Sequence, residues 1–158
     1  MGQDTGDRFF LVVVDDTEEL HQALYFACGR TKKTGGRIAM VYVIPPAEFA
    51  HWAGVGELMR QEAREKAEEA IAREAKHVEA LTGKAPLVFI KEGKPAEEIL
   101  ALLHDEPNIR LIVLGADTKA DTAGPLVSYL TGKGASVCPV PVTIVPGNLS
   151  DEQIDHLI

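Results

Sequence analysis

The chain has 158 residues, with 16 lysines and arginines against 24 aspartates and glutamates, so its formal net charge is −8. Hydrophobic residues make up 46% and charged residues 25%, which is typical of a single globular domain and excludes a disordered chain. An acidic chain without a basic run is a poor candidate for binding nucleic acid or an anionic membrane. Its apolar runs are all far shorter than the ~20 residues that a membrane-spanning helix needs.

Five apolar runs predict β-strands. Each run is continuous rather than alternating, which is typical of strands that are covered on both faces of a parallel sheet. The runs cover residues 9–14, 37–44, 86–90, 109–114 and 140–145.

Helices are predicted between these strands. Asp16 and Glu19 have the spacing of a capping box, so the first helix should begin near Thr17 and end at Gly35–Gly36. The other helices between strands are expected over about residues 57–81, from Pro95, and within residues 125–136.

The alternation of strands and helices predicts an α/β fold, with a single open five-stranded parallel sheet of Rossmann-like type and helices on both faces. In such sheets, ligands bind beyond the carboxyl ends of the strands, where the strand order reverses. Asp15, residues 43–45, residues 91–93 and the loop 115–124 follow those ends. We therefore take Asp15 and the loop that begins at Gly115 as the candidate site.

Residues 47–56 are expected to form a loop that carries Phe49, His51 and Trp52. The rings of Phe49 and Trp52 would either stack on a bound nucleoside or pack beneath the long helix that follows. The sequence leaves both interpretations open.

The sequence lacks the residues that several other kinds of functional site require. A receiver domain would bind magnesium through Asp15–Asp16, but the third strand ends in Ile90-Lys91-Glu92, without the aspartate that accepts the phosphoryl group. Gly83-Lys84 and Gly132-Lys133 lack the remaining residues of a P-loop. The five histidines have no metal-ligand spacing, and no serine lies in a nucleophile elbow. We therefore expect neither a metal site nor an enzyme.

The two cysteines and the N-terminus favour the cytoplasm. Cys28 and Cys138 form no CxxC motif, and we expect them to be small apolar residues in a reducing compartment. The first residues, MGQDTGDRFF, contain no apolar signal region. We therefore expect a cytoplasmic protein.

Four short segments occur in the order and spacing of a known family. They are V-D-D-T at 14–17, G-K-P at 93–95, L-I-V-L-G at 111–115 and P-V-T-I-V at 141–145. Over about residues 8–146 the chain resembles the universal stress protein family. The resemblance implies a five-stranded sheet of the adenine-nucleotide α-hydrolase-like type and a role in stress response.

The resemblance also implies a homodimer that pairs through the last strand, residues 140–145. An apolar edge strand without a neighbour favours the same pairing, because its free backbone groups otherwise promote aggregation. The family domain would span residues 1–147 and leave residues 148–158 as a C-terminal tail. In the tail, Ser150 and Gln153 form a second capping box, which predicts a short and loosely attached helix.

Family members that bind ATP carry the pattern G-x2-G-x9-G-[ST] after the fourth strand, where backbone N–H groups approach phosphate oxygens. Aligned without gaps, Gly115 keeps the first position, and Thr118, Ser128 and Tyr129 stand at the other three. Together with Thr131, these residues form the candidate phosphate side of the site. Because three of the four positions depart from the pattern, the resemblance implies an eroded phosphate-binding loop.

This sequence matches the family positions better on the adenosine side of the site than on the phosphate side. Asp15, Thr17 and Val43 match the family positions that meet adenosine. The pair Gly124-Pro125 would restore a glycine to the loop only along a changed path. The loop also carries aspartates, which repel a triphosphate more strongly than they repel AMP.

We therefore expect a homodimeric universal stress protein without catalytic activity or an assigned cofactor, which binds an unidentified protein partner or a small ligand. The alternative is a stress switch that binds ATP or AMP through Asp15 and the loop 115–131. A third hypothesis, an enzyme of the related adenylyl-transfer or electron-transfer α/β groups, lacks an HxGH or SGGxD signature.

Overall fold

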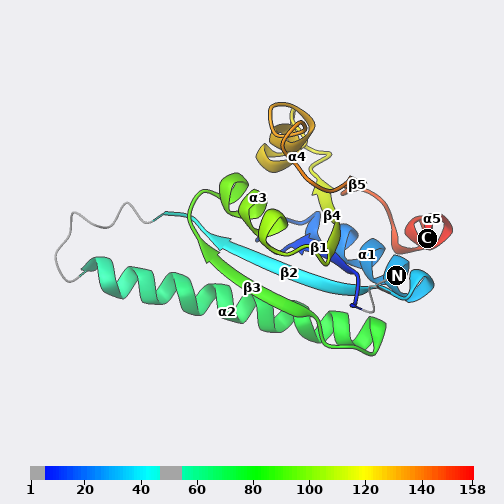
Figure 1. Ribbon diagram of the computed structural model, residues 1–158, viewed down its shortest axis with the longest axis horizontal. Coiled ribbons are helices and arrows are strands. Elements are labelled where there is room, and N and C mark those ends of the chain that lie inside the picture. Colours follow the sequence, from blue (N-terminus) through cyan, green and yellow to red (C-terminus); the bar gives the residue numbers. More distant parts are fainter. Residues whose placement is uncertain (1–5, 47–54) are drawn as a thin grey trace, which may run out of the picture.

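The computed structural model describes residues 6–46 and 55–158, in which strands and helices alternate along the chain (Figure 1). The predicted loop residues Phe49, His51 and Trp52 lie outside the described residues. The strands are β1 (Phe9–Val13), β2 (Arg37–Ile44), β3 (Leu87–Glu92), β4 (Ile109–Ala116) and β5 (Val142–Pro146). The helices are α1 (Leu20–Thr34), α2 (Val55–Thr82), α3 (Pro95–Asp105), α4 (Pro125–Thr131) and α5 (Asp151–Leu157).

The five strands form one parallel sheet in the order β3-β2-β1-β4-β5. The central strand β1 pairs with β2 on one side and with β4 on the other, so that Leu11 lies opposite both Ala39 and Ile112. After β1, the chain adds β2 and then β3 on one side of it, and then adds β4 and β5 on the other side. The strand order therefore reverses between β1 and β4, and the predicted fold class is confirmed.

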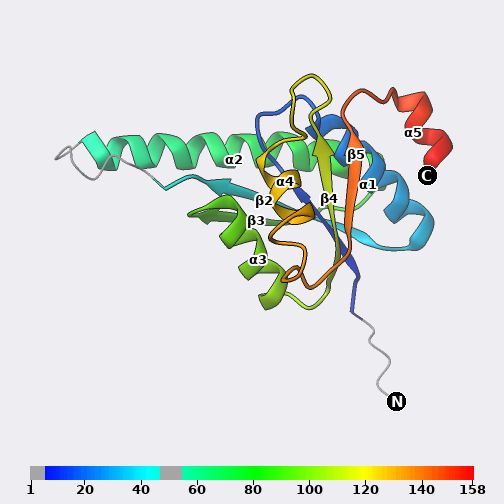
Figure 2. The same cartoon turned by 90° about the horizontal axis from the view of Figure 1, so that it is seen from above.

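Helices cover both faces of the sheet, and Figure 2 shows α2 and α3 on opposite sides of it. One face packs against α1 and α2, and the other against α3 and α4. Leu11, Val12 and Ile112 are fully buried because each central strand has a helix over both of its faces. This two-sided burial is the physical reason why the strand sequences are continuous apolar runs.

The glycines that follow the first two helices end them as expected. Gly35 has φ 79° and Gly83 has φ 76°, and each donates its N–H to a carbonyl of the preceding helical turn. A left-handed residue at this position satisfies carbonyls that the helix leaves unpaired, and glycine adopts it without steric cost.

The predicted start of the first helix is wrong. Helix α1 begins at Leu20, and its N-cap residue Glu19 makes no capping hydrogen bond with its side chain. The carboxylate of Asp16 instead forms an ion pair with Lys66 of α2, with 3.1 Å between Oδ2 and Nζ. The turn before α1 is closed by Asp15, whose Oδ1 accepts from the backbone N–H of Thr17 at 3.0 Å. This turn delays the helix by three residues.

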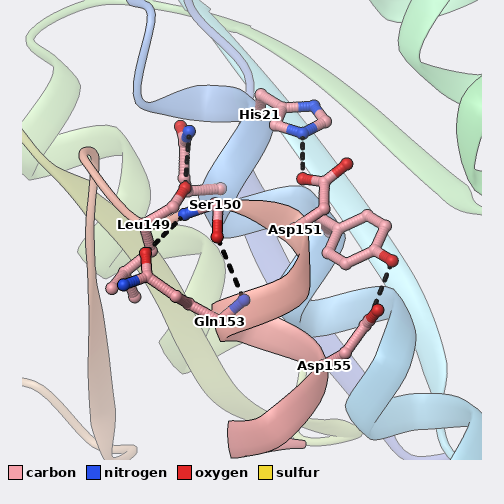
Figure 3. A network of polar contacts seen from close by, with 8 residues as sticks. His21, Leu149, Ser150, Asp151, Gln153 and Asp155 are labelled. Atoms are coloured by element: carbon pink, nitrogen blue, oxygen red, sulfur yellow. Dashed lines mark hydrogen bonds and ion pairs between the residues drawn. The ribbon is translucent and has the colours of Figure 1, made fainter.

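The tail forms the predicted helix α5, and its capping box is present: Ser150 and Gln153 each accept a hydrogen bond from the other's backbone N–H. The expectation of a loose attachment is wrong, because Ile154 is fully buried and the helix is bonded to α1 along its length (Figure 3). His21 Nε2 lies 2.7 Å from Asp151 Oδ1, and the Tyr25 hydroxyl donates to Asp155 at 2.8 Å.

Both cysteines are free. Cys28 is buried within the core beneath α1, and this burial raises the pKa of its thiol to about 12. A thiol with such a pKa carries almost no reactive thiolate at neutral pH, as expected of a small apolar residue. Among the described helices, none combines the length and the apolar character that crossing a membrane requires.

Candidate functional site

The candidate site is a small hollow at the carboxyl ends of β1 and β4, where the strand order reverses. The hollow has a volume of about 130 Å³. Asp15 and Thr17 line it from the β1–α1 turn, Gly115 lines it from β4, and residues 123–127 line it from the start of α4. The structure thus brings together three of the residues that the sequence placed in the site, at the position expected for a ligand in an open parallel sheet.

Asp15 and Thr17 act as a unit in this hollow. The carboxylate of Asp15 is exposed, and its Oδ1 accepts hydrogen bonds from both the backbone N–H and the hydroxyl of Thr17. Thr17 therefore orients the carboxylate and does not cap α1. The ion pair between Asp16 and Lys66 fixes the same turn to α2 from the other side, and the carboxylate raises the pKa of Lys66.

Gly115 is required by close packing. A Cβ atom at this position would overlap the backbone carbonyl group of Glu19, with its carbon only 2.9 Å away. A Cβ at Gly147 would likewise lie 2.7 Å from the Cβ of Glu19 and 2.7 Å from the carbonyl oxygen of Ala116. Glu19, the residue before α1, therefore packs between the ends of β4 and β5, where both glycines leave space for it.

The loop between β4 and α4 is held by its own side chains. Asp117 Oδ1 accepts from the backbone N–H groups of Lys119 at 2.8 Å and of Ala120 at 3.2 Å. The ammonium group of Lys119 lies 2.6 Å from a carboxylate oxygen of Glu18, and this hydrogen bond raises the pKa of Lys119. Two N–H groups and one lysine that would otherwise be available to a phosphate are therefore bound to carboxylates.

The sequence comparisons agree with this architecture. The model of the Universal stress protein family matches residues 8–146. The chain belongs to the universal stress protein family. A search of curated proteins finds no match.

Solved structures of universal stress proteins share the fold. One is UspA from Lactobacillus plantarum, with 20% identity over 89% of this chain and 99% of the other and a TM-score of 0.72. Another, from Archaeoglobus fulgidus, has 17% identity, coverage of 89% and 98%, and a TM-score of 0.67. A third, from Burkholderia pseudomallei, has 18% identity, coverage of 87% and 95%, and a TM-score of 0.65.

The remaining candidate residues of this universal stress protein lie outside the lining of the hollow. Thr118 is exposed in the loop, and Val43 is buried in the core on the α3 side of the sheet. On α4, Ser128 is exposed and the hydroxyl of Thr131 donates to the carbonyl of Val127 at 2.7 Å. The ring of Tyr129 packs against the core.

The sequence interpretation included residues 123–127 in the candidate loop 115–131, but it did not assign Glu19, or the Gly147 that packs on it, to the site of this universal stress protein. Glu19 drew attention only as part of a capping box, although its backbone forms one wall of the hollow. A glycine at or just after the ends of the last two predicted strands, Gly115 and Gly147, was a signal of close approach that the sequence did contain. Among the residues that the structure describes, no group of histidine, cysteine and acidic side chains could hold a metal ion.

Proposed function

We propose that this universal stress protein is a binding module without catalytic activity, which acts by associating with a protein partner or a small ligand. The observation that carries this proposal is the composition of the hollow. Its polar side chains come from Asp15, Thr17 and Glu19, and its described lining contains no histidine, cysteine or lysine. An aspartate held by a threonine is suited to orienting a hydroxyl or an amine. The described lining offers no histidine, cysteine or lysine beside this carboxylate to act as a base or a nucleophile, and the Thr17 hydroxyl already donates to Asp15.

Purified protein is expected to hydrolyse ATP no faster than a buffer blank. The assay measures inorganic phosphate released over several hours at a protein concentration high enough to detect a single turnover. Sustained turnover that is lost in Asp15→Ala would overturn the proposal of a non-catalytic module.

A second candidate function is binding of an adenine nucleotide, and the charges around the hollow favour AMP over ATP. Universal stress proteins have been solved in complex with cAMP and, from Archaeoglobus fulgidus, with dAMP, at 16% and 17% identity and TM-scores of 0.57. In this proposal Asp15 and Thr17 meet the ribose. The backbone N–H group of Lys119 in the β4–α4 loop already donates to the carboxylate of Asp117, which leaves it less available to a phosphate. The phosphates of a bound ATP would lie near the carboxylates of Glu18 and Asp117. Repulsion between the phosphate and carboxylate charges weakens the binding of ATP.

The nucleotide hypothesis predicts that AMP binds with a dissociation constant on the order of 1 mM or tighter and that ATP binds more weakly. Asp15→Ala should weaken AMP binding by about tenfold, because a hydrogen bond to a charged group is lost. Asp16→Ala is the matched control, since that carboxylate pairs with Lys66 and does not line the hollow. Native mass spectrometry with titrated nucleotide measures both. Equal losses in the two variants would contradict a specific role for Asp15.

We also propose that the protein is a homodimer that pairs through β5. This strand is the last of the sheet, and its side chain Ile144 is 37% exposed. Light scattering should give twice the mass of a single chain at micromolar concentration, and Ile144→Lys should give the mass of one chain. Val88→Lys on β3, the opposite edge, is the control, because Val88 is 45% exposed there. A monomeric wild-type protein would overturn the proposal.

We place this activity in the cytoplasm. The support is chemical, because Cys28 and Cys138 are both free. Unpaired cysteines of this kind persist in a reducing compartment.

A further inference from the structure

A second cavity of about 650 Å³ runs between α1 and α2, beside the Asp15 hollow. We call it the α1–α2 groove. Its lining includes the apolar side chains of Leu20 and Leu24 from α1 and of Leu81 from α2. The volume lies within the range of small-molecule sites, which are commonly ~300–1,000 Å³ and mostly apolar.

Helix α5 completes one end of the groove. The side chain of Asp151 forms part of its lining, and His21 Nε2 holds this carboxylate at 2.7 Å (Figure 3). The family match ends at residue 146, so α5 lies beyond the matched domain. One end of the groove is therefore formed by a segment outside the part of the chain that the family model matches.

The charges that line the groove favour a cation. Its side chains include five carboxylates but only one arginine, Arg73. Three of the carboxylates have cationic partners. These pairs are Asp16 with Lys66, Glu18 with Lys119, and Glu74 with Arg73. The lining also holds two histidines, His21 beside Asp151 and His77 beside Glu74. The carboxylates of Asp15 and Asp151 bond only a threonine and a histidine, so the groove has an excess of negative charge when both histidines are in the neutral form.

The walls of the groove favour a flat apolar body. The rings of His21 and Tyr25 stack with their centroids 5.9 Å apart and an angle of 26° between their planes. Across the groove, Leu81 is 38% exposed, although the neighbouring Val78 on the same helix is buried. An aromatic group placed between these walls would cover the exposed part of Leu81 and lie against the stacked rings.

We propose that the α1–α2 groove binds a small amphipathic amine. Its aromatic or apolar body packs against Leu24, Tyr25 and Leu81, and its ammonium group lies among the carboxylates of the rim, with Asp151 at the α5 end. The groove shares Asp15 and Thr17 with the hollow, but Leu24, Tyr25, Leu81 and Asp151 line the groove and not the hollow, so amine binding can be tested independently of nucleotide binding.

The test uses 2-phenylethylamine as the probe and 3-phenylpropionate as its charge-reversed control. Both are titrated into the full-length protein while backbone amide signals are followed by NMR. The amine should bind with a dissociation constant on the order of 1 mM, at least about tenfold tighter than the carboxylate. Its shifts should centre on residues 20–25 and 73–81. Equal affinities for the two probes, or shifts confined to Asp15 and Gly115, would overturn the proposal.

Two variants separate the groove from the rest of the surface. Leu81→Lys places a cation in the α2 wall of the groove and should weaken amine binding by about tenfold or more, whereas Leu58→Lys should leave it unchanged. Leu58 is 56% exposed on the same helix and lies outside the groove. Asp151→Asn removes charge but keeps a hydrogen-bonding side chain, and it should weaken the amine by about threefold. Unchanged affinity in both groove variants would overturn the proposal even if AMP binds at Asp15 as expected.

Discussion

Gly115→Ala is expected to lower the free energy of unfolding by about 2–3 kcal/mol. The added Cβ would overlap the carbonyl group of Glu19, where the neighbouring atoms belong to backbone and not to the end of a flexible side chain. Neither partner can move cheaply, because β4 is paired with both β1 and β5 and Glu19 directly precedes α1. Urea denaturation followed by circular dichroism measures the loss.

Gly29→Ala is the matched control for this prediction. A Cβ at Gly29 would also overlap a neighbour, but that neighbour is the end of the Ile158 side chain, with Cγ1 at 3.0 Å. A flexible side chain can rotate away, and alanine is favoured over glycine within a helix by about 1 kcal/mol. The free energy of unfolding should therefore change by less than about 1 kcal/mol. If Gly115→Ala were equally mild, close packing against Glu19 would not be the reason for glycine.

This comparison also bears on the family motif. Gly115 is the one position of the phosphate-binding pattern that this chain retains, and the pattern alone would assign it to a ligand. The structure gives it a packing role that holds with or without a nucleotide. A retained glycine is therefore weak support for phosphate binding here, whereas the paired Asp15 and Thr17 are a more direct reason to test AMP.

The fold could be predicted from the sequence because a strand that is buried on both faces of the sheet has a continuous run of apolar residues. The second strand was predicted at residues 37–44 and is found as Arg37–Ile44. The ends of the first two helices were equally readable, since a glycine just after the last turn has a local geometric cause. In both cases the cause acts within a few residues of the chain.

The errors arose where the deciding partner is distant in sequence. Asp16 has the spacing of a capping residue, but the structure pairs it with Lys66, fifty positions away, and gives the turn to Asp15. The arrangement of the hollow depends on Glu19 meeting Gly115 and Gly147 across three elements. Local spacing carries no information about such contacts, so the sequence indicated which residues lie at this edge of the sheet but not how the hollow is built.

Helix α5 also has a partner that is distant in sequence, because it docks on α1. The second prediction with a large expected effect concerns the burial of Ile154 in this contact. Ile154→Ala is expected to lower the free energy of unfolding by about 2–4 kcal/mol, because a fully buried isoleucine is truncated. Leu157→Ala on the same helix is the control, with an expected loss of less than about 0.5 kcal/mol, because Leu157 is 60% exposed. Hydrogen exchange of the backbone amides, alongside urea denaturation, separates detachment of α5 from global unfolding.

The polar contacts of α5 should matter much less than Ile154. The pair His21–Asp151 is solvent-exposed on both sides, and such pairs contribute about 0–1 kcal/mol. His21→Ala should therefore leave α5 protected from exchange, whereas Ile154→Ala should expose its amides first. The decrease in the free energy of unfolding caused by Ile154→Ala also has an upper limit. Once α5 has detached, weaker docking of α5 no longer changes the stability of the remaining domain. If His21→Ala detached the helix as readily as Ile154→Ala, the hydrogen bonds of Figure 3, and not the burial of Ile154, would hold α5 on α1.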